Sequence, residues 1–221
     1  MDKKHKVILI TISRFVMAAE VLVLGPSGSG KTLLLDRFRQ VLQSYDNVDI
    51  YSKSSTTIPT IGVDVVSFRI HDRDIQVREV GSAMASQWTN YMKYCSAIVY
   101  VIDVSDPISV ARSMMLLLEI IGSNDTQGKP LAVALNKTDL VADGMFGILQ
   151  YEESIKLNII LKEREDKNLD DKYSNLADCR TVKLYGSSLD LSLAIKLNDW
   201  IMAIAKGWTE RSFRYSGSCS S

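Results

Sequence analysis

The feature that most constrains this chain is a glycine-rich segment that lies between two apolar patterns of different period. It reads Gly25-Pro26-Ser27-Gly28-Ser29-Gly30-Lys31-Thr32 and fits GxxxxGK[ST]. The buried-strand pattern of Glu20–Leu24 precedes it, and helical periodicity over Gly30–Ser44 follows it. A strand, a glycine-rich loop and a helix in this order predict a phosphate-binding loop.

The residue types of this loop match the chemistry of a nucleotide's phosphates. Glycines let backbone N–H groups turn inward around phosphate oxygens, and the start of the helix adds partial positive charge. Lys31 can reach the β- and γ-phosphates, and the Thr32 hydroxyl can ligate Mg²⁺. The candidate phosphate-binding residues of the loop are Gly25, Ser27, Gly28, Ser29, Gly30, Lys31 and Thr32.

A second motif distinguishes guanine from adenine. Asn136-Lys137-Thr138-Asp139 follows the apolar run Pro130–Leu135. A carboxylate at Asp139 can accept hydrogen bonds from both N1–H and the 2-amino group of guanine, whereas adenine offers neither donor there. The stem of Lys137 can cover the base, and Asn136 can tie this loop to the phosphate loop. GTP or GDP is therefore the expected ligand.

Strand and helix patterns alternate along the chain. The order is β-α-β-β-α-β-α-β-α-β-α, which predicts a doubly wound α/β sheet of six mostly parallel strands with one antiparallel edge strand. The charged run Glu163–Lys172 is interpreted as a solvated loop, and Gly207 is expected to end the last helix. The predicted strands are Glu20–Leu24, Gly62–Ile70, Asp74–Glu79, Ser96–Asp103, Pro130–Leu135 and Thr181–Leu184. The other predicted helices are Ala83–Tyr94, Ser109–Ile121, Tyr151–Lys162 and Ser192–Lys206.

A family resemblance adds to these expectations. Thr56-Thr57-Ile58-Pro59-Thr60-Ile61-Gly62 resembles switch I of Arf-family small GTPases, and the spacing from there to Glu79-Val80-Gly81-Ser82 is similar to the Arf interswitch. The segment from Arg78 to Pro107 most resembles a divergent Arf-like branch of that family. The resemblance implies a P-loop small GTPase fold and Mg²⁺ ligation by Thr60 when GTP is bound. It also implies protein effectors that contact switch I and switch II.

Switch II departs from the family pattern at three positions. Glu79 stands where the family has a metal-site aspartate, and it keeps the charge, so Thr32, Thr60 and Glu79 are the candidate metal ligands. Ser82 replaces a glycine whose N–H meets the γ-phosphate. Serine keeps that N–H, so Ser82 is a further candidate phosphate-binding residue, but it restricts the backbone there. Ala83 replaces the glutamine that orients attacking water. We therefore expect GTP hydrolysis to be very slow or to depend on a partner protein.

The loop after the last strand is less informative. Tyr185-Gly186-Ser187-Ser188 stands where relatives present a Ser-Ala pair to the guanine carbonyl. Ser187 is the candidate guanine-binding residue of this loop, together with Asn136, Lys137 and Asp139.

Composition limits the partners. There are 26 basic and 26 acidic residues, so charge gives no reason to expect nucleic acid binding. Three widely spaced cysteines favour a reducing compartment, and we expect a cytoplasmic protein. We also expect a monomer that has no transmembrane segment and is served by an exchange factor or activating protein, and we leave membrane contact open.

The expected organisation has three parts. Residues 17–206 form the nucleotide-binding domain, and residues 207–221 form a disordered tail. Residues 1–16 form an N-terminal extension, whose place in the natural protein is left open because the resemblance begins near Met17.

Alternatives to the nucleotide-gated switch remain. A pseudo-GTPase scaffold is favoured by Ser82 and Ala83, whereas the intact Lys31, Thr32 and Asp139 oppose complete loss of binding. A membrane-anchored Arf-like receptor subunit would use the apolar run 7–13 as its anchor. A P-loop ATPase or kinase would not need the NKxD motif.

Overall fold

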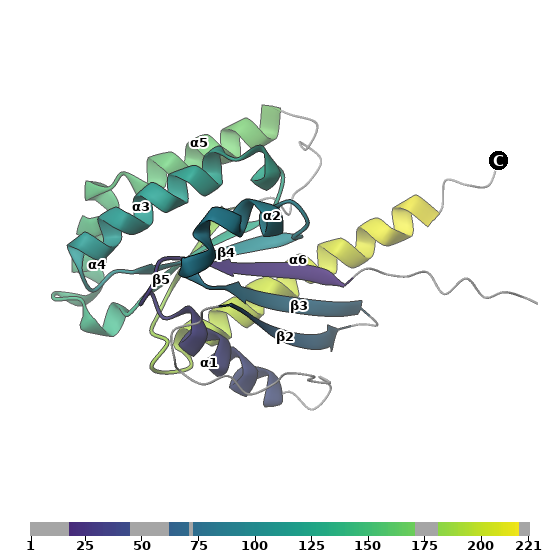
Figure 1. Cartoon of the computed structure of the whole chain (residues 1–221), viewed down its shortest axis with the longest axis horizontal. Helices are drawn as coiled ribbons and strands as arrows, with labels where there is room; N and C mark the ends of the chain where they lie inside the picture. The colour runs from purple at the N-terminus through teal and green to yellow at the C-terminus, as the bar shows by residue number, and fades with distance from the viewer. Residues whose placement is uncertain (1–17, 45–61, 71–72, 171–180, 217–221) are drawn as a thin grey trace, which may run out of the picture.

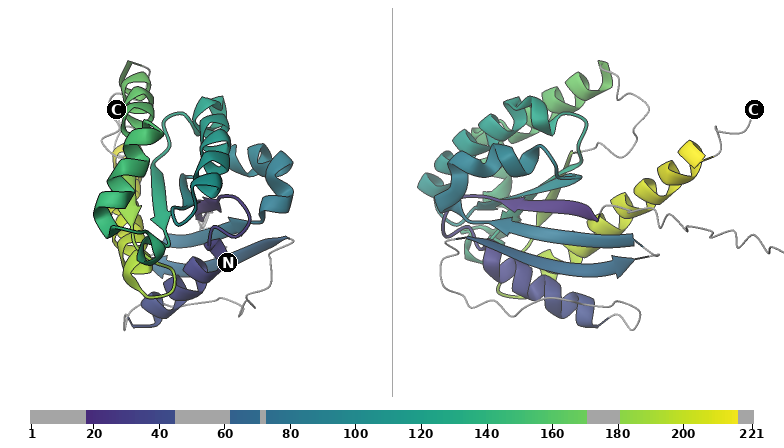
Figure 2. Two further views of the ribbon diagram at one scale, coloured as in Figure 1. Left: turned by 90° about the vertical axis from the view of Figure 1, so that its left-hand side faces the viewer. Right: turned by 45° about the vertical axis from the view of Figure 1, so that its right-hand side comes forward.

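A computed structural model describes residues 18–44, 62–70, 73–170 and 181–216 of the 221-residue chain. They form one sheet with helices packed on both of its faces (Figure 1; Figure 2). Figure 1 shows α2, α3 and α5 above the sheet and α1 below it.

The sheet has six strands in the order β2-β3-β1-β4-β5-β6. Strand β2 pairs with β3 antiparallel, and every other pairing is parallel, so the predicted mixed sheet with an antiparallel edge strand is confirmed. The strands are β1 (Ala19–Leu24), β2 (Val63–Ile70), β3 (Arg73–Val80), β4 (Ala97–Asp103), β5 (Leu131–Asn136) and β6 (Thr181–Tyr185).

Helices cross between the parallel strands. The α-helices are α1 (Lys31–Gln43), α2 (Trp88–Met92), α3 (Pro107–Gly122), α4 (Gly144–Ser154), α5 (Leu157–Asp170) and α6 (Ser192–Ser216). Three short 3-10 helices are η1 (Ser82–Gln87), η2 (Asn124–Thr126) and η3 (Thr138–Leu140).

The central strands are apolar on both faces because each face is covered by helices. In β1, Val21 and Val23 belong to a core shared with α1 and α6, whereas Leu22 and Leu24 belong to a second core shared with α2, α3 and α5. Strand β4 divides its side chains in the same alternating way. This two-sided burial explains why the sequence shows continuous apolar runs there.

Three expectations about helix boundaries were wrong. The predicted helix 151–162 is divided between α4, which ends at Ser154, and α5, which begins at Leu157. The charged run that begins at Glu163 is helical as far as Asp170, because Arg164 is buried and hydrogen-bonds to Thr126 O, Lys129 O and Thr181 Oγ1. Tertiary partners therefore outweigh the local polarity. Helix α6 also continues past Gly207 to Ser216, since a glycine inside a helix costs only about 1 kcal/mol.

The parallel strands place the loops that carry the motifs at one edge of the sheet. Strand β1 leads into the phosphate loop, β3 ends at Val80, and β5 ends at Asn136. Parallel strands β1, β3, β4, β5 and β6 all run toward this edge, which is where ligands bind in open α/β sheets. Within the described part of the chain, no helix is both long and apolar enough to cross a membrane.

Candidate functional site: a nucleotide-binding edge of the sheet

The phosphate loop depends on three glycines for its backbone path. Gly25, Gly28 and Gly30 have φ angles of +149°, +76° and +90°, which L side chains rarely adopt. A Cβ at Gly25 would collide with the carbonyl oxygen of Val101, and a Cβ at Gly30 would collide with Nδ2 of Asn136. The loop therefore presents backbone rather than side chains along this path, as a phosphate cradle requires.

Two polar side chains of this loop are buried. The Lys31 ammonium donates to Pro26 O at 2.9 Å, and the residue is only 5% exposed. Burial lowers the pKa of Lys31, and the nearby Glu79 carboxylate partly opposes that shift. The Ser29 hydroxyl oxygen is buried and has no hydrogen-bond partner among the described residues. A buried cation and an unsatisfied hydroxyl fit a site for a phosphate group.

The two described metal-ligand candidates meet across the sheet edge. Thr32 begins α1 and Glu79 lies near the end of β3, and the Thr32 hydroxyl donates to Glu79 Oε1 at 2.9 Å. Glu79 is 2% exposed. Hydroxyl and carboxylate oxygens are ligands that suit Mg²⁺, so these residues fit the metal. The third candidate, Thr60, lies outside the described residues, and its role stays a prediction.

Asn136 joins three loops. Its Nδ2 donates to Ser29 O at 2.7 Å and to Ser188 Oγ at 3.0 Å. The backbone N–H of Ser188 donates back to Asn136 Oδ1 at 2.8 Å. Asn136 is fully buried, so this side chain links the phosphate loop, the end of β5 and the loop after β6. The link to the phosphate loop is the one that the sequence led us to expect.

Lys137 is held by a carboxylate at the end of the neighbouring strand. Asp103 lies opposite Asn136 in the pairing of β4 with β5, and Lys137 Nζ donates to Asp103 Oδ2 at 2.5 Å. Burial alone would raise the pKa of the Asp103 carboxyl, but hydrogen bonds from Lys137 and Ser105 outweigh it and lower that pKa. Lys137 has φ of +63°, a left-handed conformation that directs the chain into η3.

The remaining guanine candidates lie in the adjacent loops. Asp139 is exposed within η3. Ser187 is buried, its N–H donates to Ser192 Oγ at 3.1 Å, and its Oγ accepts from Leu189 N at 3.1 Å. These local bonds order the loop, while the contact of Ser187 with a guanine carbonyl stays a prediction.

In the switch II segment Ser82 begins η1, and Ala83 is exposed beside it. Trp88 is buried, and its Nε1–H donates to Gly81 O at 3.4 Å. Tyr91 is half-buried against the same core. Trp88 therefore packs as a core residue and supports the start of η1 from inside.

Two residues of the site were missed by reasoning from sequence. Ser188 was passed over in favour of Ser187, and only the fold shows that the second serine meets Asn136. Asp103 was noted only as part of a resemblance. A usable signal existed, since a carboxylate that ends a buried central strand points to the loop edge of the sheet.

The site therefore combines a glycine-lined phosphate loop, a hydroxyl and a carboxylate suited to Mg²⁺, and an NKxD loop that Asn136 ties to the phosphate loop. Comparisons with known proteins identify the family and support the fold. The model of the ADP-ribosylation factor family matches residues 6–182. ADP-ribosylation factor-like protein 16 of Homo sapiens is 32% identical over 119 residues, which are 54% of this chain and 59% of that protein. ADP-ribosylation factor-like protein 1 of Caenorhabditis elegans is 32% identical over 122 residues, 54% of this chain and 62% of that protein.

The chain thus spans less than two thirds of the length of these curated relatives. Among solved structures, the Arl6 BBS3 small GTPase from Trypanosoma brucei with bound nucleotide analogue GppNp has a TM-score of 0.62 and 16% identity. That match covers 86% of this chain and 98% of the other, and it supports the fold. Since the family model covers most of the sequence, this chain belongs to the ADP-ribosylation factor family of small GTPases.

Proposed function

We propose that this protein is a guanine-nucleotide switch that binds GTP or GDP together with Mg²⁺ and hydrolyses GTP slowly or not at all without a partner. The observation that carries the proposal is the Asn136 network, which couples the phosphate loop to the base-recognition loop. A P-loop that binds phosphate alone would not need this coupling.

The metal part of the proposal depends on Thr32 and Glu79. Bound Mg²⁺ would supply positive charge beside the phosphates. The chain's own contribution is to hold a hydroxyl and a carboxylate next to each other at the start of α1. Glutamate retains the negative charge that the family's aspartate has, so we expect metal binding to survive the replacement.

Slow hydrolysis follows from Ala83. A methyl group cannot orient a water molecule, and Ala83 is exposed at the start of η1. Unaided small GTPases that retain the glutamine already hydrolyse GTP at roughly 10⁻⁴ per second. The output of the switch would then be contact with protein effectors through switch I and switch II, and an exchange factor or activating protein would set its state. We propose a cytoplasmic location on the basis of cysteine usage alone.

The direct test is titration of a fluorescent GTP analogue into the purified full chain, with and without Mg²⁺, in competition with GTP, GDP and ATP. We expect GTP and GDP to compete and ATP to fail. Lys31→Ala should abolish binding, and Asp139→Ala should weaken guanine binding selectively. Folded protein without saturable binding would contradict the proposal and favour the pseudo-GTPase scaffold.

Single-turnover hydrolysis tests slow GTP hydrolysis separately from guanine-nucleotide binding. Protein loaded with GTP should convert it at a rate below about 10⁻⁴ per second. Rapid turnover by the unaltered protein would show that another group replaces the missing glutamine, while leaving guanine binding intact.

A further inference from the structure

Helix α3 carries an exposed apolar stripe that its own core does not use. The stripe comprises Ile108, Ala111, Met115, Leu118 and Gly122, which follow one another at spacings of three and four residues. Ile108 is 71% exposed, Met115 is 70% exposed and Leu118 is 49% exposed. This alternation is the heptad spacing by which one helix packs along another.

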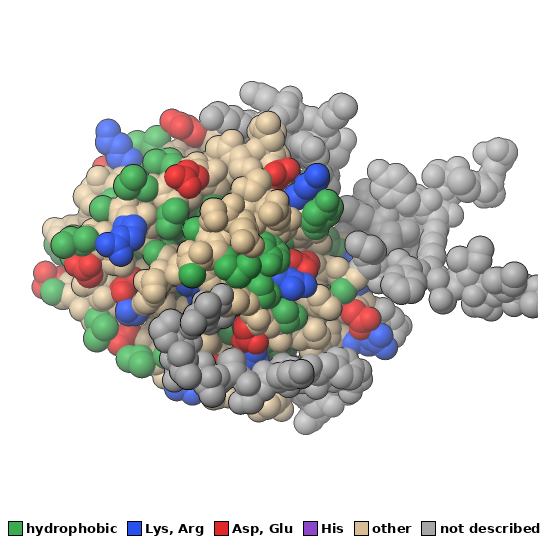
Figure 3. All heavy atoms as spheres, viewed as in Figure 1, with side chains coloured by type: hydrophobic (Ala, Val, Ile, Leu, Met, Phe, Trp, Pro, Cys, Tyr) green, Lys and Arg blue, Asp and Glu red, His purple; other side chains and the backbone are tan. Residues whose placement is uncertain are grey.

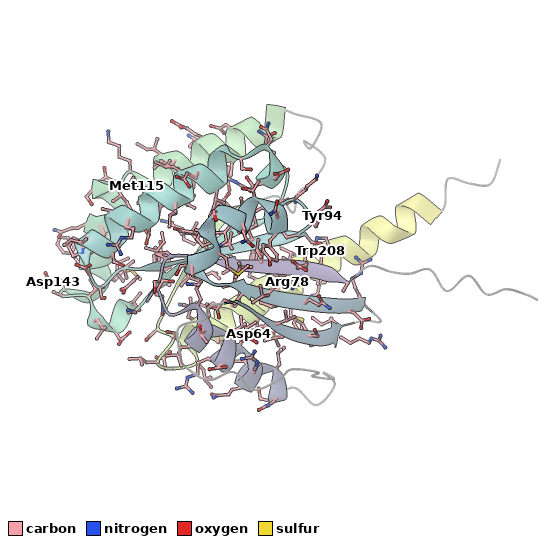
Figure 4. The ribbon with its side chains drawn as sticks, in the orientation of Figure 1. Asp64, Arg78, Tyr94, Met115, Asp143 and Trp208 are labelled. Carbon is pink, nitrogen blue, oxygen red and sulfur yellow. The ribbon has the colours of Figure 1, made fainter. Side chains whose placement is uncertain are left out.

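The other face of α3 is buried in the core of the protein. Val110, Met114, Leu117 and Ile120 face inward and belong to the core that α3 shares with α5. Met115 points away from the sheet (Figure 4). Figure 3 shows separate hydrophobic side chains on this side of the molecule, set among polar, basic and acidic ones. The stripe is therefore a second, outward face of α3.

Two charges flank the stripe. Arg112 and Glu119 are both exposed, and neither forms an ion pair with another residue in the part of the chain that the structure describes. They are seven residues apart, so they lie on the same side of the helix about two turns from each other. Within α3 itself the first half thus carries one basic side chain and the second half carries one acidic side chain.

That arrangement makes the face complementary to itself in one orientation. Two parallel copies of α3 would place the two Arg112 side chains, and likewise the two Glu119 side chains, on opposite flanks of the contact, so neither charge would meet an opposite one. Two antiparallel copies related by a twofold axis bring Arg112 of each copy beside Glu119 of the other. Isologous contacts with twofold symmetry are the commonest way in which identical chains associate.

We propose that α3 is a docking surface for a second copy of this chain, packed antiparallel about a twofold axis that passes near Leu116 and Leu117. This register places Met115 of each copy against Leu118 of the other. The two outer layers pair Ala111 with Gly122, and these small residues let the backbones approach. From sequence alone we expect a monomer, whereas this face predicts reversible self-association.

The contact is expected to be weak. One 16-residue helix spans about 24 Å, and a contact between single helices falls below the area that stable dimers bury. We therefore expect a dimer that forms at high protein concentration and at low ionic strength, since salt screens the exposed charge pairs. Raising the local concentration would favour it.

Sedimentation velocity on the full chain over a concentration series tests the proposal. Unaltered protein should show a weight-average sedimentation coefficient that rises with concentration. Arg112→Glu alone and Glu119→Arg alone should each raise the dissociation constant by about tenfold or more, because two attractive pairs become repulsive. The double variant R112E/E119R should associate like the unaltered protein, since its charges are again complementary.

An equimolar mixture of the two single variants is the most specific test of the antiparallel charge pairing. Arg112→Glu carries two acidic residues on this face and Glu119→Arg carries two basic ones, so the mixture should form a heterodimer although neither variant associates alone. Met115→Glu should abolish association, whereas Ile159→Glu, at an exposed apolar site on α5, should leave it unchanged. A concentration-independent monomer would overturn the proposal. Association that neither charge reversal weakens would also overturn it, and so would association that Ile159→Glu abolishes as Met115→Glu does.

Discussion

Among single residues, Asn136 links groups that are far apart in sequence. It bonds Ser29, which is 107 residues earlier, and Ser188, which is 52 residues later. Because all three residues are buried, water cannot replace the lost bonds if the amide is removed. A single side chain thus sets how the phosphate loop lies relative to the base loop.

We predict that Asn136→Ala lowers the free energy of unfolding by about 1–3 kcal/mol, because the Ser29 carbonyl and the Ser188 N–H lose their partner. Release of a fluorescent guanine nucleotide should also accelerate by about tenfold or more, which a urea melt and a stopped-flow chase would measure. Asn90→Ala, on the exposed face of α2, should change the free energy by less than about 0.5 kcal/mol. Equal effects of the two substitutions would contradict the role of Asn136.

The Asp103–Lys137 pair predicts a dependence of stability on acid. The pKa of Asp103 in the folded protein is lowered from its ordinary value of 3.8, so its contribution is fully present above that value and is lost as pH falls through the lowered pKa. The difference in unfolding free energy between the unaltered protein and Asp103→Asn should therefore be constant near neutral pH and shrink in acid below 3.8.

Urea denaturation at a series of pH values between about 3 and 7 would measure this difference. A gap that stays constant into strong acid would show that the carboxylate's charge is not what Lys137 needs. Asp143→Asn, an exposed residue on the neighbouring loop, should change stability at neutral pH by less than about 0.5 kcal/mol.

Among the helices, α5 is mostly polar in sequence, yet it carries one buried arginine, Arg164. Arg164 reaches backbone carbonyls on the segment before β5 and a hydroxyl on β6, so it fixes one end of the sheet's last two strands. Its guanidinium supplies several donors in a fixed plane, which suits three acceptors on different segments.

We predict that Arg164→Met destabilises the protein by about 1–3 kcal/mol, because its acceptors at Thr126 and Lys129 lose a charged donor. Lys162→Met, two residues away and exposed, is the matched control and should cost less than about 0.5 kcal/mol. Denaturant unfolding of both variants would decide, and a small loss at Arg164 would mean that α5 is held by its apolar side alone.

At the scale of the whole molecule, nucleotide binding should be visible as stability, because one ligand would contact loops from both halves of the sheet. GTP with Mg²⁺ at 100 times its Kd adds about 2.7 kcal/mol. For a domain of this size we predict a rise in Tm of about 5–10 °C.

Differential scanning fluorimetry would measure that shift. ATP should give none, and neither should GTP added to the Lys31→Ala variant. A shift that survives Lys31→Ala would mean that the nucleotide stabilises the fold from somewhere other than the phosphate loop.

Local patterns were sufficient for the fold and for much of the site. The mostly parallel six-stranded sheet with an antiparallel edge strand agrees with what the patterns and the family resemblance predicted, and two of the predicted metal ligands, Thr32 and Glu79, lie within hydrogen-bonding distance of each other. The helical state of 163–170 was missed because charge along a short run says nothing about distant acceptors.

The sequence by itself determined which loop can bind phosphate, since glycine dihedrals, strand alternation and helix periodicity are properties of neighbouring residues. The contacts of Ser188 with Asn136 and of Asp103 with Lys137, and the burial of Trp88, became visible only in the tertiary structure. Each of these depends on which strand ends lie side by side and how far a side chain must reach between them. That geometry arises only when the whole sheet and both its helical layers have formed.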